Sequence, residues 1–119
     1  MRRRQLLVLG LTLALAGCSP GIAELNGKPT KFYQQSVSFR ARVSRIQTLG
    51  GETLLELADA QEHRIFVRTE GAPEAAPDDW VKVTGVLVPE ARVGGKIVYD
   101  IVLADSVTPA RAPWFRNLF

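Results

Sequence analysis

The sequence predicts an all-β protein whose core is a small five-stranded barrel. Apolar and polar residues alternate with the period of a half-buried strand in several segments. Glycine pairs and proline-containing stretches separate these segments, as expected of turns and loops. Beyond the first eighteen residues, no segment is long enough for a helix that could cover a sheet. A sheet with one apolar face must be covered or closed, so we expect closure into a barrel.

The first two strands are predicted on either side of Gly50-Gly51. Residues 36–44 alternate, with the apolar side chains of residues 37, 39, 41 and 43 on one face. After the glycine turn, residues 53–58 place Leu55 and Leu57 on one face with Glu56 between them. These two segments therefore predict a hairpin at the start of the sheet.

The remaining strands follow after short connections. We expect a hairpin loop over 59–62 and a third strand over 63–69, in which Ile65 and Val67 share the inner face. Residues 70–79 contain two prolines and predict a loop. The fourth strand is predicted over 80–88, a connection over 89–96 and the last strand over 97–103. Gly85, inside the fourth strand, indicates a bulge or a close backbone approach.

The segment before the first strand is polar and contains several glycines and prolines. Within it, Ile22 and Leu25 have the spacing of one face of a short helical turn. Asn26-Gly27 and Pro29 are expected to end that turn.

The N-terminus has the pattern of an export signal. Arg2, Arg3 and Arg4 precede an apolar stretch from Leu6 to Ala16. As a helix this stretch would reach only about 17 Å, which is too short for the hydrocarbon core of a bilayer. The next residues, Leu15-Ala16-Gly17-Cys18, resemble the lipobox of bacterial lipoproteins over all four positions.

This resemblance implies that Cys18 is acylated, with palmitate among its chains, and becomes the mature N-terminus. Two or three acyl chains would anchor the protein durably to a membrane. Ser19 stands where an Asp would favour retention in the inner membrane, so the expected address is the periplasmic side of the outer membrane. Two alternatives are an ordinary secretory signal cleaved elsewhere and an N-terminal helix of a cytosolic protein.

Composition and charge argue against several function classes. The three N-terminal arginines belong to a total of 15 Lys and Arg, so the chain without them has 12 basic residues against 12 acidic ones. This neutral balance argues against nucleic acid as a partner. One Cys and one His cannot form a usual zinc site, and no nucleophile motif is present, so we expect no metal, no cofactor and no enzymatic activity. His63 is expected at the surface, and Asp59 in a turn where it bonds its own backbone.

The strand pattern resembles the OB-fold of the nucleic-acid-binding, transfer-RNA-anticodon-binding-like class over roughly residues 22–108. The resemblance is carried by Val37–Val43, Leu55–Asp59, Arg64–Val67, Trp80–Val86 and Ile101. The helix usual between the third and fourth strands is replaced by a proline-containing loop. The resemblance implies a five-stranded Greek-key barrel with a binding face on its second and third strands.

Carried onto this chain, that face has aromatic and charged side chains suited to stacking and to anion contacts. Gly50-Gly51 and residues 92–96 would form its rim. In the alternative interpretation, Phe66 belongs to a second apolar layer and the arginines pair with Glu52, Glu56 and Glu62. The candidate binding residues are Arg40, Arg42, Glu56, Arg64, Phe66 and Arg68.

The C-terminal tail is rich in large apolar side chains. Trp114, Phe115 and Phe119 are candidates for docking onto a partner protein or a membrane interface. The alternative is that the tail packs against the barrel.

Together these patterns predict a lipid-anchored protein of the cell envelope that acts as a non-catalytic protein-interaction module. The alternative function is binding of an anionic glycan or an oligonucleotide. The expected partners are the membrane, through the N-terminal lipid, and an envelope protein. The expected organisation is a signal peptide over 1–17, a lipid-anchored lead-in over 18–35, the barrel over 36–108 and an aromatic tail over 109–119.

Overall fold

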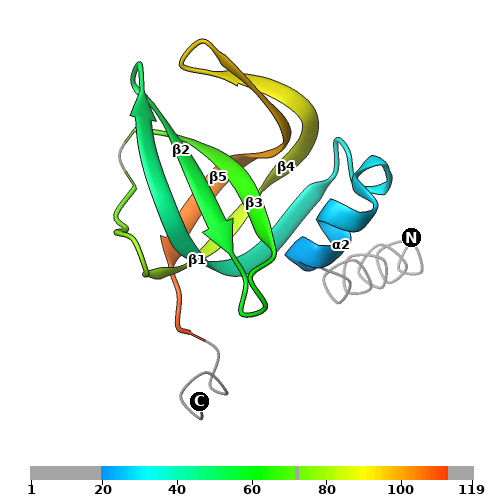
Figure 1. Ribbon diagram of the computed structural model, residues 1–119, viewed down its shortest axis with the longest axis horizontal. Helices are drawn as coiled ribbons and strands as arrows, with labels where there is room; N and C mark the ends of the chain where they lie inside the picture. Colours follow the sequence, from blue (N-terminus) through cyan, green and yellow to red (C-terminus); the bar gives the residue numbers. More distant parts are fainter. Residues whose placement is uncertain (1–19, 72, 113–119) are drawn as a thin grey trace, which may run out of the picture.

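Two short helices and five strands make up the part of the chain that the structure describes (Figure 1). The computed structural model describes residues 20–71 and 73–112. The elements are α2 (Ile22–Gly27), η1 (Pro29–Lys31), β1 (Ser36–Leu49), β2 (Glu52–Ala58), β3 (Arg64–Glu70), β4 (Trp80–Val93) and β5 (Lys96–Pro109).

The five strands close into a barrel in the order β1-β2-β3-β5-β4. Adjacent strands are antiparallel, with the exception of β3 and β5, which run parallel. The β3–β5 ladder is also the shortest, with three residue pairs from Phe66 opposite Ile101 to Arg68 opposite Leu103. The closed five-stranded sheet confirms the predicted all-β class and barrel.

Inward-facing side chains from all the strands fill the barrel. On β1 the predicted alternation is confirmed, because residues 37, 39, 41 and 43 are buried and the residues between them are not. Ile65 and Val67 face inward on β3, as predicted. The strand residues of this main core are Val37, Phe39, Ala41, Val43, Leu55, Leu57, Ile65, Val67, Val81, Val83, Leu87 and Val102.

The segment before β1 contributes to the same core. Ile22 is 2% exposed and Leu25 is 1% exposed, and both belong to the main cluster. The helix α2 that presents them ends at Gly27 and is followed by η1, which begins at Pro29. This confirms the predicted helical turn. Burial of each side chain contributes about 1.5–3 kcal/mol, so α2 is held firmly against the barrel.

The distal halves of β4 and β5 form a hairpin arm, which we define as residues 87–100. In Figure 1 the arm curls away from the barrel as the yellow and orange loop at the top. Its inner side packs on the outer face of β2, where Leu54 is 6% exposed although it points away from the barrel interior. The second apolar cluster consists of Leu54, Val88, Val93 and Ile101.

The predicted connection over residues 89–96 is wrong. In the structure β4 continues through Pro89 to Val93, and only Gly94-Gly95 separates it from β5. Proline is tolerated here because β4 pairs with β1 only as far as Val86, so the arm lies at the edge of the sheet. Both turn glycines have positive φ, 57° and 87°, as a two-residue type I′ hairpin turn requires.

The predicted bulge at Gly85 is confirmed. The register between β4 and β5 shifts between Thr84 and Gly85. A side chain at this position would collide with the carbonyl oxygen of Leu103, and its Cβ would lie 2.8 Å from the Cα of Ala104. Only glycine allows the two backbones to approach this closely.

Both ends of the chain carry predicted residues that lie outside the described part. Cys18 precedes it, and Trp114, Phe115 and Phe119 follow it. Neither helix within residues 20–71 and 73–112 has the length and apolar character needed to cross a bilayer.

Replacing Gly85 by alanine should destabilise the barrel. The added methyl group meets three backbone atoms of Leu103 and Ala104 that cannot move independently, so we expect a loss of about 1–3 kcal/mol in the free energy of unfolding. Urea denaturation measures this loss. Gly27→Ala is the matched control, since nothing lies within 4 Å of its Cβ position. An equal effect of the two substitutions would show that the close approach at Gly85 is unimportant.

Candidate ligand groove

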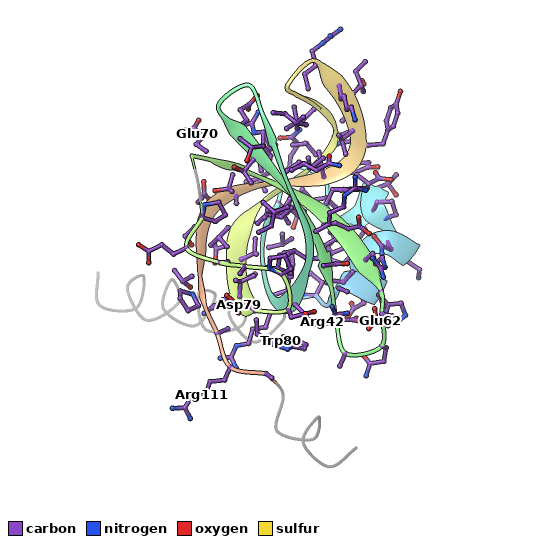
Figure 2. All side chains as sticks on the ribbon, turned by 60° about the vertical axis from the view of Figure 1, so that its left-hand side comes forward. Arg42, Glu62, Glu70, Asp79, Trp80 and Arg111 are labelled. Carbon is purple, nitrogen blue, oxygen red and sulfur yellow. The ribbon has the colours of Figure 1, made fainter. Side chains whose placement is uncertain are left out.

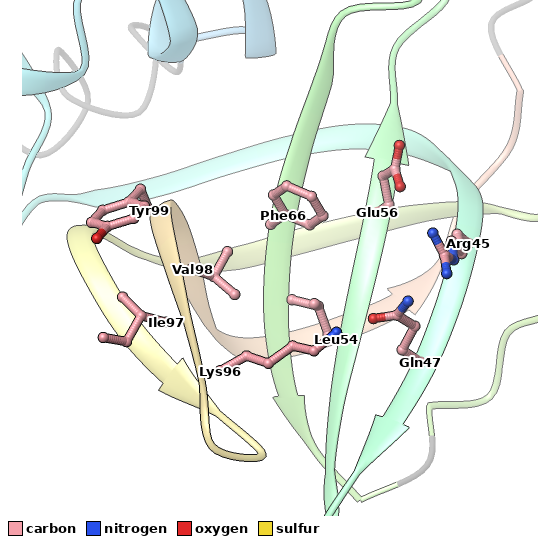
Figure 3. A pocket seen from close by; sticks show the side chains of 9 residues that line it. All are labelled: Arg45, Gln47, Leu54, Glu56, Phe66, Lys96, Ile97, Val98 and Tyr99. Atoms are coloured by element: carbon pink, nitrogen blue, oxygen red, sulfur yellow. The ribbon is translucent and has the colours of Figure 1, made fainter.

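A groove of about 430 Å³ lies between the hairpin arm and the outer face of the barrel. Figure 3 shows its floor, formed by β1, β2 and β3, and its wall, formed by the first residues of β5. The lining residues are Arg45, Gln47, Leu54, Glu56, Phe66, Lys96, Ile97, Val98 and Tyr99.

The groove gathers the exposed apolar surface of the described chain. Phe66 is 39% exposed, Ile97 46% and Tyr99 67%, and these are the three large hydrophobic residues that stand out as exposed in residues 20–71 and 73–112. All three line the groove. A contiguous exposed apolar patch rimmed by polar residues is typical of a binding surface.

An open strand edge also borders this region. It does not belong to β3, which pairs with β5 only from Phe66 and before that is capped by α2, since Asn26 Nδ2 donates to the backbone oxygen of Arg64. Residues 96–99 of β5 pair with β4 alone within the same described ranges. Unpaired strand edges offer backbone N–H and C=O groups to another extended chain.

Asp100 fixes the position of the arm. Its φ of 52° is in the left-handed region, which bends β5 just before it joins β3. The Tyr33 hydroxyl donates a hydrogen bond to Asp100 Oδ1. This bond ties the arm to the segment that follows η1, on the side of the groove where Tyr99 lies.

A bulge in β1 brings Arg45 into the groove. Val43 is opposite Leu57 and Arg45 is opposite Glu56, so Ser44 is an extra residue. Strict alternation would have turned Arg45 toward the interior, and for this reason the sequence did not predict it. The bulge instead places Arg45, Glu56 and Phe66 side by side on the outer face.

The carboxylate of the groove forms an ion pair, whereas its two cations form none with the described residues. Glu56 is bound by Arg64, with 2.7 Å between Oε1 and Nη1. When the Gln47 amide is oriented with its oxygen toward the guanidinium, Arg45 Nη2 donates to that oxygen at 2.7 Å. Neither Arg45 nor Lys96 forms an ion pair with a described residue. The groove therefore offers two exposed positive charges beside its apolar surface.

Of the six predicted binding residues, the structure brings Glu56 and Phe66 into the groove and places the arginines outside its lining. Arg40 is exposed on β1 opposite Lys82 of β4, away from β2 and β3. Lys96 lies in the predicted rim. The sequence did not predict the other six lining residues, which are Arg45, Gln47, Leu54, Ile97, Val98 and Tyr99. The alternation of Ile97 and Tyr99 with Lys96, Val98 and Asp100 was the signal for the wall.

Three of the predicted arginines form ion pairs with carboxylates of the described residues. Arg42 Nη2 lies 2.8 Å from Glu62 Oε1, and Figure 2 shows these two side chains at the end of the barrel near Asp79 and Trp80. Arg64 contacts Glu56 and also lies 3.7 Å from Glu62. Arg68 lies 3.4 Å from Glu52. These are the acidic partners that the alternative interpretation named, although Phe66 is exposed in the groove and does not lie in a second apolar layer.

The turn between β2 and β3 is held by Asp59. Its Oδ1 accepts from the backbone N–H groups of Gln61 and His63, which confirms the predicted self-bonding turn. Its Oδ2 lies 2.9 Å from His63 Nδ1, and the His63 side chain is exposed as predicted. No group of three His, Cys, Asp or Glu side chains suited to a metal ion occurs in the described ranges.

Comparison with known proteins identifies the fold of this barrel. The sequence matches no known protein family and no curated protein. Aspartyl tRNA synthetase from Entamoeba histolytica is structurally similar, with a TM-score of 0.59 and 16% identity over 81% of this chain. A replication protein A heterotrimer bound to single-stranded DNA gives a TM-score of 0.49 and 17% identity over 70% of this chain.

This chain spans 22% of the synthetase chain and 62% of the replication protein A chain. The likeness to the synthetase therefore concerns the barrel and not a whole enzyme. Together with the strand order, it shows that the protein has the OB fold, as the sequence resemblance implied.

Ionisation of Tyr33 reports on the attachment of the arm. The hydrogen bond to Asp100, desolvation and the negative charge of Asp100 raise the pKa of Tyr33 above its ordinary value of 10.0. The resulting contribution to stability is complete below pH 10.0 and is lost as pH rises through the raised pKa.

A pH titration followed by the ultraviolet absorbance of ionised tyrosine should therefore show a phase at high pH, the late phase, that comes from Tyr33. Tyr33→Phe should remove it. Asp100→Asn should move this phase to lower pH, because the amide carries no charge and can donate to the phenolate. Tyr99→Phe is the control and should leave the late phase in place. A late phase that survives Tyr33→Phe would contradict the assignment.

Proposed function

We propose that the protein is a lipid-anchored, non-catalytic module of the cell envelope that binds an extended segment of a partner protein in its groove. The observation that carries this proposal is that Phe66, Ile97 and Tyr99, the large exposed hydrophobic residues of the described ranges, line one groove beside the open edge of β5. An extended peptide can pair with such an edge and place alternate side chains on the apolar surface.

The charges of the groove define the partner further. Arg45 and Lys96 are exposed and have no carboxylate partner among the described residues, whereas Glu56 is already bound by Arg64. An acidic side chain on the partner would complement these two cations. We therefore infer a segment with apolar side chains at alternate positions and at least one Asp or Glu.

The absence of catalysis belongs to the same proposal. The groove contains one carboxylate, held by an arginine, and the other polar groups of its lining are two cations, an amide and the Tyr99 hydroxyl. Such a set of side chains suits binding better than proton transfer. The anchor at Cys18 and the outer-membrane address rest on the lipobox and on Ser19, which lie outside the described residues.

Photocrosslinking in cells tests the groove in the intact protein. With p-benzoylphenylalanine in place of Tyr99, we expect a covalent adduct to one partner protein, because this side chain lines the groove and is 67% exposed. The same label in place of Lys82, exposed on β4 outside the groove, should give no such adduct. Gel electrophoresis and mass spectrometry identify the adduct.

Charge reversal is the specificity control of that experiment. Arg45→Glu with Lys96→Glu should lower the adduct yield about tenfold or more, since a hydrogen bond to a charged group contributes about 1.5–3 kcal/mol. Arg40→Glu with Lys82→Glu makes the same charge change outside the groove and should leave the yield unchanged. Equal adducts from the two label positions would reject the groove as the protein-binding site.

A second candidate function is binding of an oligonucleotide or an anionic glycan. It is favoured by the two unpaired cations beside the rings of Phe66 and Tyr99, since stacking and phosphate or carboxylate contacts use such groups. Oligo(dT) and hyaluronate are suitable probes. Binding of either that weakens with salt and is lost in Tyr99→Ala would favour this function over protein binding.

The anchor makes a separate prediction. In cells given radiolabelled palmitate, the protein should carry the label and sediment with the membrane fraction. Cys18→Ala should abolish both, because acylation needs the thiol. Ser19→Ala should retain both. Labelled protein in the Cys18→Ala variant would locate acylation elsewhere.

A further inference from the structure

The strongest remaining feature is the surface formed by the exposed side of α2 and η1. A hollow of about 390 Å³ lies there, lined by Ala23, Glu24, Gly27, Lys28, Lys31 and Phe32. The Lys31 ammonium lies 5.8 Å from the centre of the Phe32 ring. Lys28 and Lys31 are exposed, and neither forms an ion pair with a described residue.

The chain length to Cys18 determines what this surface meets. Three residues, Ser19, Pro20 and Gly21, separate Cys18 from Ile22. Even fully extended, the four Cα–Cα steps span about 15 Å at most. A lipid on Cys18 would therefore hold the start of α2 close to the bilayer surface.

The helix cannot move away from the barrel to relieve this constraint. Ile22 and Leu25 are almost completely buried in the main core, and Asn26 Nδ2 donates to the backbone oxygen of Arg64 at 2.7 Å. Because α2 is fixed to the barrel, a bilayer close to α2 is also close to the side of the barrel on which α2 packs. Figure 1 shows the turn between β1 and β2 on the opposite side of the barrel from α2.

We infer that the surface carrying Lys28, Lys31 and Phe32 lies against the membrane and binds the anionic phosphate groups of phospholipids. This inference rests on the proposed anchor. Two lysines outweigh the single carboxylate of Glu24 in the hollow, so its charge is complementary to a negative bilayer. Lysine stems and an aromatic ring are also suited to the boundary between headgroups and acyl chains.

The test uses the full lipidated chain in vesicles of phosphatidylethanolamine and phosphatidylglycerol. Because Cys18 is the one cysteine and carries the lipid, Thr30→Cys supplies a single free thiol for a fluorophore beside the proposed contact. Thr48→Cys supplies the control position, near the turn between β1 and β2. Spin labels on the lipid headgroups should quench the fluorophore several-fold more strongly at residue 30 than at residue 48.

The lysines give the matched variants. In the protein labelled at residue 30, Lys28→Gln with Lys31→Gln should weaken the contact about fivefold per lysine and reduce the quenching. Lys82→Gln with Arg92→Gln removes the same charge elsewhere and should leave quenching unchanged. Replacing phosphatidylglycerol with phosphatidylcholine should reduce quenching at residue 30 as the lysine variants do.

Failure of the inference and failure of the anchor can be distinguished. A palmitate-bearing, vesicle-bound chain with equal quenching at residues 30 and 48 would overturn the inference alone. Quenching at residue 30 that is indifferent to both lysines would overturn phosphate binding. A chain without palmitate would overturn the anchor, and the membrane-facing orientation with it.

Discussion

The closure of the barrel through three residue pairs between β3 and β5 is the constraint on which the rest of the structure depends. β5 must join β3 at Ile101 to close the sheet, and before that residue it is free of β3. The bend at Asp100 separates the two functions of the strand. Its later part completes the core, and its earlier part forms the hairpin arm. A longer ladder between β3 and β5 would pair the edge of β5 that now borders the groove.

The arm is stabilised because it buries apolar surface outside the barrel. Leu54 points away from the interior and would be exposed on a bare five-stranded sheet, but the arm covers it with Val88 and Val93. This burial holds the arm in place, while Phe66, Ile97 and Tyr99 remain uncovered beyond it. The second apolar cluster therefore holds the arm against β2, and the groove lies beside it, where the arm does not cover the barrel.

The pairing of charges explains how a nearly neutral chain has a locally positive groove. Glu52, Glu56 and Glu62 contact Arg68, Arg64 and Arg42, which lie on the strands around the groove. Exposed pairs of this kind contribute only about 0–1 kcal/mol to stability. Their larger effect is to decide which cations are available to a ligand. Arg45 and Lys96 lie outside these pairs, so the overall charge count does not describe the groove.

Much of the fold could be predicted because inward and outward residues alternate regularly on the first half of β1 and on β3. Gly85 was also informative, because a glycine inside a strand marks a bulge or a close backbone approach. The groove could not be predicted in the same way. One extra residue, Ser44, reverses the orientation of everything after it on β1, and no sequence signal marks the bulge. Pro89 resembles a strand end unless the edge position of the arm is known. Both errors arise from contacts between strands, which alternation within one strand does not contain.

The lead-in segment joins the proposed membrane contact to the proposed binding site. Ile22 and Leu25 fix its first part in the core, and Tyr33 fixes its last part to Asp100 at the base of the arm. With no flexible linker between α2 and the barrel, a lipid on Cys18 would orient the groove as well as retain it. A partner would then have to present its extended segment close to the same bilayer, which favours proteins that are themselves attached to or embedded in that membrane.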